Sequence, residues 1–162
     1  WVSVYNINLG VGRARVSDKH WIYFPEVEYP FYRAGFPMNF SPSLGRPGCS
    51  SMYVEMSHKP TEHQSAEQLI DRARAGLEQA GILRPDDELV VSDVKDLHYA
   101  YVYFDHHRAK AMPAILAELE RRGIYSVGRY GRWEHTSMED AIGQGKQVAE
   151  RLRVRYSHKA SA

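Results

Sequence analysis

The fold is decided by the stretch from Ile124 to Ala149, which reads IYSVGRYGRWEHTSMEDAIGQGKQVA. Its first four residues, 124–127, form a short apolar run of the kind that buried strands show. Gly128 and Gly131 follow, and glycines let a backbone approach a ligand closely. We therefore predict a strand, a glycine-rich turn and then a helix over 137–153.

The start of that helix carries a capping pattern. Ser137 can accept a hydrogen bond from the helix backbone, and Asp140, three residues on, can reciprocate in the manner of a capping box. Glu139 and Asp140 also suit the positive end of the helix dipole. Such an end stabilises negative charge, which a reduced flavin carries on the N1/C2=O edge of its ring. On these residues alone, an ordinary capped helix is the simpler alternative.

Several separated segments together resemble a known family. GRYGRW at 128–133, followed by SMEDAI at 137–142 and by Gly145, is similar to the C-terminal flavin motif of the amine oxidase and UDP-galactopyranose mutase superfamily. The resemblance is closest to UDP-galactopyranose mutase-like proteins of the eukaryotic type. The segments that carry this closer likeness are WIYFPE at 21–26, PFYRA at 30–34 and the residues from Asn39 to Pro42.

The resemblance implies two sets of site residues, and the sequence predicts no metal ligand. The implied substrate-binding residues are Trp21, Tyr23, Arg33, Tyr101, Arg129 and His135. The implied cofactor-binding residues are Gly128, Arg129, Gly131, Ser137, Met138 and Glu139.

Each implied role has a plain physical basis. Trp21 and Tyr23 would line a nucleotide-sugar pocket, because aromatic faces pack on sugar and base rings. Arg33 would grip the diphosphate with its fork of donors. Arg129 would lie near both flavin and diphosphate, and Tyr101 would add a phosphate-directed hydroxyl. The alternatives are a core position for Trp21 and Tyr23, a surface position for Arg33 and strand packing for Tyr101.

The resemblance implies FAD as the cofactor and a mutase reaction on a nucleotide sugar, with flavin N5 as the nucleophile. Two features keep other activities open. His135 stands where the mutases usually carry a tyrosine, and the string at 137–142 is nearer to the amine oxidase and protoporphyrinogen oxidase branch. The alternatives are therefore an FAD-dependent oxidoreductase of that branch, or a binding module without catalysis.

The glycine motif that holds the ADP part of FAD in a Rossmann fold does not occur in this sequence. Residues 10–13, Gly-Val-Gly-Arg, lack the third glycine and a following helix. The chain also begins at Trp1 rather than at methionine. We therefore expect 1–162 to be the C-terminal fragment of an FAD-dependent parent, with little FAD affinity and no activity of its own. The helix over 137–153 would pack on the missing FAD-binding domain.

The remaining segments predict an α+β fold with a mixed, mainly antiparallel sheet and packed helices. Helical spacing predicts a helix over 66–80 that Gly81 stops, and a second helix in which Pro113 fits the first turn and Gly123 closes the last. We divide the chain into a strand-rich part on the substrate side and a helix-strand part before the last helix. The parts are 1–60 and 61–136, and the expected strands are 2–9, 20–24, 36–40, 51–56, 88–93 and 98–104.

Composition and charge exclude several classes of function. The net charge is +1, from 21 basic and 20 acidic residues, so no overall field attracts nucleic acid or an anionic membrane. No apolar run is long enough to span a bilayer. The eight histidines lack metal-ligand spacing, and the single cysteine, Cys49, fits a reducing cytoplasm. We expect 153–162, including Lys159, to be a frayed basic tail.

Overall fold

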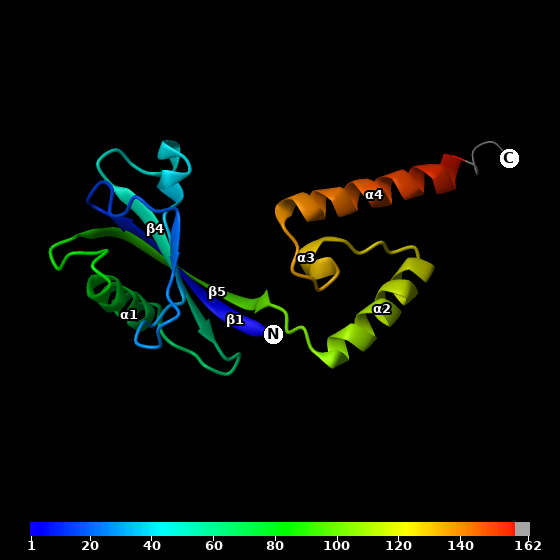
Figure 1. Ribbon diagram of the computed structural model, residues 1–162, viewed down its shortest axis with the longest axis horizontal. Coiled ribbons are helices and arrows are strands. Elements are labelled where there is room, and N and C mark those ends of the chain that lie inside the picture. The colour runs from blue at the N-terminus through cyan, green and yellow to red at the C-terminus, as the bar shows by residue number, and fades with distance from the viewer. Residues whose placement is uncertain (158–162) are drawn as a thin grey trace. The chain divides into compact units, whose positions relative to one another are not determined.

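The computed structural model describes residues 1–157 of the chain. They form two compact units, divided between Ala100 and Tyr101 (Figure 1). The first unit contains a five-stranded sheet and the helix α1, and the second contains the helices α2, α3 and α4. The predicted α+β class is confirmed.

The sheet has the strand order β2-β3-β4-β1-β5. Its pairs β2·β3, β3·β4 and β1·β4 are antiparallel. Strand β5 also runs antiparallel to β1, because Gly12 N donates to Glu88 O near one end and Ser3 Oγ donates to His98 O near the other. The mainly antiparallel sheet predicted from the sequence is therefore confirmed. The strands are β1 (Val2–Val11), β2 (Trp21–Tyr23), β3 (Arg33–Gly35), β4 (Ser50–His58) and β5 (Leu89–Tyr101).

Helix α1 (Ala66–Gln79) packs on one face of this sheet. Ser65 begins it with a capping box to Gln68. The helix ends in a Schellman motif, in which Gly81 has φ +69° and Ile82 N donates to Leu77 O at 3.0 Å. The core joins α1 to alternate residues of β1 and β4, namely Ile7, Leu9, Val11, Met52, Val54, Met56, Leu69, Ala73 and Leu77.

The second unit contains the helices α2 (His106–Arg121), α3 (Gly128–Gly131) and α4 (Met138–Ser157). Among its described residues, 101–157, only Thr136 is buried. Large apolar side chains are exposed instead, with Met138 at 87% and Ile142 at 73%. Taken by itself, this unit has no apolar core to hold its helices together.

Two predictions around the glycine-rich segment are wrong. Residues 124–127 form no strand, because Gly123 N and Ile124 N complete a Schellman motif on Glu120 O and Leu119 O at the end of α2. Ile124 is 52% exposed rather than buried. The expected glycine-rich turn is instead the short helix α3.

Several other boundaries also differ from the prediction. Residues 36–40 are not a strand, because Pro37 begins a 3-10 helix, Pro37–Asn39, which a second one, Pro42–Leu44, follows. Pro113 lies inside α2, since Asp105 caps that helix earlier by accepting from Arg108 N at 2.7 Å.

The two strands expected around residues 88–104 are one strand, β5, because β1 offers a continuous partner along it. The first strand is longer than the predicted 2–9, because β1 continues to Val11, which pairs with Ser50. The expected basic tail is helical to Ser157, while Lys159 lies outside the described residues. No helix among residues 1–157 is long and apolar enough to cross a membrane.

Candidate functional site

The sheet face opposite α1 carries three of the predicted substrate-binding residues. In a sheet, residues directly opposite each other on paired strands point to the same face. The register therefore gathers Trp21, Tyr23 and Arg33 on one face, while their neighbours Ile22 and Ala34 turn to the core. Two rows of paired residues therefore cross the strands on this face. One row consists of Trp21, Gly35, Tyr53 and Asn8, and the other consists of Tyr23, Arg33, Glu55 and Asn6.

Arg33 lies at the centre of this face in a fixed orientation. Its Nη2 donates to Oε1 of Glu55, whose side chain is 9% exposed, and the other carboxylate oxygen accepts from the Tyr32 hydroxyl. The guanidinium carbon lies 5.8 Å from the centre of the Tyr23 ring and 6.0 Å from that of Tyr53. Arg33 is thus held between two aromatic rings by a buried carboxylate.

Trp21 and Tyr23 are open to solvent on the same face, at 51% and 59% exposed. The Trp21 ring stacks on Phe40, with 5.7 Å between ring centres and 20° between planes. Tyr23 accepts a long hydrogen bond of 3.4 Å from Arg33 Nη1. Neither ring is a core residue, so the packing alternative for these two positions is wrong. Open aromatic faces beside a guanidinium suit a ligand with rings and negative charge.

Two glycines of the second unit, Gly128 and Gly131, are required by the local structure. Gly128 has φ +79°, and its N–H donates to Gln144 Oε1 at 2.7 Å. A Cβ on Gly131 would lie 2.8 Å from Ser126 Oγ, which donates to Gly131 O. Arg129 spans the following loop, because its Nε and Nη2 both donate to Thr136 O, at 3.1 and 2.7 Å. These contacts fix α3 against the start of α4.

The start of α4 has the predicted cap. Asp140 N donates to Ser137 Oγ at 3.1 Å, and the Asp140 carboxylate accepts from Ser137 N and from its hydroxyl. These donors lower the pKa of Asp140, the backbone N–H first. Met138 and Glu139 are exposed, and the first N–H groups of a helix have no partner within it. Just before the cap, Thr136 Oγ1 is buried without a hydrogen-bond partner among the described residues.

Two predicted substrate-binding residues remain, Tyr101 and His135. Tyr101 is the last residue of β5 and is partly buried, and His135 is exposed in the loop before α4.

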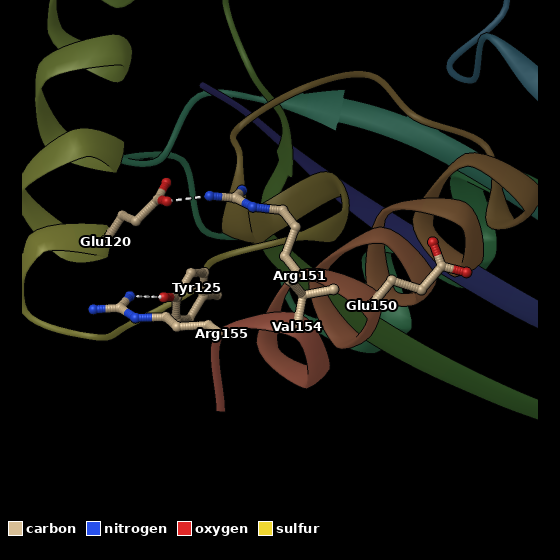
Figure 2. A pocket seen from close by; sticks show the side chains of 6 residues that line it. All are labelled: Glu120, Tyr125, Glu150, Arg151, Val154 and Arg155. Atoms are coloured by element: carbon tan, nitrogen blue, oxygen red, sulfur yellow. Dashed lines mark hydrogen bonds and ion pairs between the residues drawn. The ribbon is translucent and has the colours of Figure 1, made fainter. Parts of the chain in front are cut away.

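A pocket of about 500 Å³ also opens beside α4, but it contains none of the predicted residues. Figure 2 shows Arg151 and Arg155 directed at Glu120 and Tyr125 within it. The pocket lining is Glu120, Tyr125, Glu150, Arg151, Val154 and Arg155.

Sequence reasoning missed Glu55 and Tyr53. Strand β4 alternates core residues Met52 and Val54 with these two, so a glutamate at the centre of an apolar strand was the available signal. The sequence alone does not give the strand register, which places Glu55 opposite Arg33. No group of three or more possible metal ligands occurs among residues 1–157.

Solved structures match most of the chain, whereas no protein-family model matches it. Reduced UDP-galactopyranose mutase is 29% identical, with a TM-score of 0.73 over 82% of this chain. The predicted resemblance is confirmed. This chain spans only 29% of the length of that mutase chain.

The second structure shows the fold alone. It is a protein assigned as a protoporphyrinogen oxidase from Exiguobacterium sp. 255-15, which is 13% identical, with a TM-score of 0.70. The match covers 95% of this chain and 35% of that one. The present chain therefore corresponds to about a third of each of these two chains, and of the two likenesses, that to the mutase is supported by sequence as well as by fold.

Proposed function

We propose that this chain is the C-terminal part of an FAD-dependent, cytoplasmic enzyme of the UDP-galactopyranose mutase type. The observation that carries the proposal is the open sheet face on which Trp21, Tyr23 and Arg33 lie together. In this proposal the rings of Trp21 and Tyr23 hold the sugar or base of a nucleotide sugar, and Arg33 binds its diphosphate. Tyr101, Arg129 and His135 are also proposed as substrate-binding residues, as the resemblance implies.

The residues around the start of α4 fit a flavin. When bound, FAD would supply N5 as the nucleophile at the anomeric carbon. The helix start offers N–H groups at Met138 and Glu139 to a negatively charged ring edge. The unpartnered Thr136 Oγ1 adds a polar atom beside them. Arg129, held on Thr136 O, and the tight turn at Gly131 position this edge.

The exposed surface of α4 supports a missing FAD-binding domain. Met138 and Ile142 lie one helical turn apart and are both largely exposed. A Cβ on Gly143 or Gly145 would meet nothing within 4 Å. Each glycine inside a helix costs about 1 kcal/mol relative to alanine, and no contact among residues 1–157 explains either one. We propose that the FAD-binding domain of the parent approaches α4 closely at these glycines.

The test is made on the full-length parent protein. We expect it to purify yellow and to convert UDP-galactopyranose to the furanose form only when the flavin is reduced. Replacing Arg33 by alanine should lower activity at least a hundredfold, and replacing the exposed Arg46 in the same unit should leave it unchanged. Lysine at position 33 should restore activity only in part, because it lacks the fork of donors.

Other outcomes separate the alternatives. Steady hydrogen peroxide formation from amines, without mutase activity, would assign the parent to the oxidase branch. A colourless parent would remove both enzyme proposals and leave a binding module. We further propose that the 162-residue chain alone has negligible FAD affinity, and stoichiometric tight binding of FAD to it would contradict the missing-domain proposal.

A further inference from the structure

The ring of Tyr53 lies across Gly35 on the open sheet face. A Cβ on Gly35 would be 2.2 Å from Tyr53 Cζ and 2.5 Å from its hydroxyl oxygen. Gly35 lies in the extended strand β3 and has no positive φ, so its backbone conformation does not require glycine. Glycine at position 35 is instead required by the tyrosine ring above it.

This position places the Tyr53 ring between two proposed ligand contacts. Gly35 pairs with Trp21 on one side and with Tyr53 on the other, so the ring is directed along the row toward Trp21. Its centre also lies 6.0 Å from the guanidinium carbon of Arg33. A ligand whose negative group sits on Arg33 and whose ring reaches Trp21 would pass over Tyr53.

We infer that Tyr53, held over Gly35, is a specificity-determining residue that contacts the sugar ring of a nucleotide sugar. This inference rests on the proposed function. The aromatic face packs on the apolar C–H face of a hexose, and the phenol hydroxyl can hydrogen-bond its hydroxyl groups. UDP retains the ribose but lacks the hexose that would lie on Tyr53, so it makes no such contact. Tyr53 therefore separates nucleotide sugar from nucleotide, whereas Arg33 binds both.

The experiment measures binding of UDP and of UDP-galactopyranose to the full-length parent. Replacing Tyr53 by alanine should weaken UDP-galactopyranose about tenfold, equivalent to about 1.4 kcal/mol, and change UDP less than twofold. Replacing Gly35 by alanine should do the same, because its methyl group displaces the ring while every ligand-contacting residue remains. Tyr99→Ala, at an exposed tyrosine of β5, is the matched control and should change neither constant.

The outcomes are distinguishable. Equal weakening of both ligands, or no change in either, would overturn the role of Tyr53 and leave the proposed function intact. A wild-type parent that binds neither ligand would overturn both. Circular dichroism checks the fold of each variant. Should the alanine variants unfold, Tyr53→Leu decides, because it fills the strand position but offers no ring and should lose the same tenfold.

Discussion

Replacing Asp87 by asparagine should remove an acid-sensitive part of the stability of the first unit. The Asp87 side chain is 5% exposed and accepts two hydrogen bonds from Arg13, each of 2.7 Å, and one from Arg84 N at 2.8 Å. The Arg13 guanidinium lowers the pKa of Asp87 from 3.8 to about 2, against the opposing effect of burial. This pair ties the end of β1 to the residues before β5.

The magnitude follows from the difference in pKa. Each pH unit between the folded and unfolded pKa corresponds to about 1.4 kcal/mol, so Asp87 contributes about 2 kcal/mol to the free energy of unfolding. Because the folded pKa is the lower one, this contribution is complete above about pH 4. It is lost as the pH falls through about 2, where the folded carboxylate is protonated too.

Urea unfolding of the chain between pH 2 and 7 tests this expectation. In a Trp133→Phe background, the fluorescence of Trp1 and Trp21 reports on the first unit alone. The wild type should exceed Asp87→Asn by about 2 kcal/mol above pH 4, and the difference should vanish toward pH 2. Asp86→Asn, at the exposed neighbour, should follow the wild type. Parallel wild-type and Asp87→Asn curves over the whole range would refute the reasoning.

Three further predictions concern the site residues. Ser137→Ala removes the cap of α4 and should lower the stability of that helix by about 1 kcal/mol. Amide hydrogen exchange should then show faster exchange at the start of the helix, and unchanged protection there would argue against the cap. Gly131→Ala should destabilise α3 by roughly 1–3 kcal/mol through its clash with Ser126 Oγ. Adding Ser126→Ala should recover part of this loss in thermal unfolding of the full-length parent, and the absence of any recovery would exclude that clash as the cause. Glu55→Gln should lower the free energy of unfolding, measured in urea, by roughly 2 kcal/mol, because it removes the buried charge that pairs with Arg33. Tyr32→Phe should lower it by less, and the reverse order would contradict the central place of this ion pair.

Local patterns predicted the elements whose causes are local. The apolar spacing of 66–80 and the glycine at 81 predicted α1, because the residues that form its buried face and its C-terminal Schellman motif all lie within or next to that helix. Ser137 and Asp140 likewise foretold the cap of α4, since its hydrogen bonds join residues three apart. The sheet class also followed from short β-branched and aromatic runs.

Features with distant causes could not be predicted in this way. The run 124–127 has the composition of a strand, but it lies after a Schellman motif and pairs with no neighbouring strand. The interruption predicted between 88–93 and 98–104 contains Asp96, yet its Oδ1 lies 3.1 Å from His58 Nε2 on β4. The ion pair of Arg33 with Glu55 likewise depends on the register of β3 and β4. Only the pairing of distant strands reveals such contacts.

Residues 101–157 contain almost no buried side chains, and this affects how they would unfold within the proposed full-length parent. Three helices without an apolar core have little cooperativity of their own, so the surfaces that cover them must supply it. Calorimetry of the parent should therefore show no separate melting transition for these residues. They would melt together with the FAD-binding domain that we propose packs on α4, although the polypeptide connects them to the sheet.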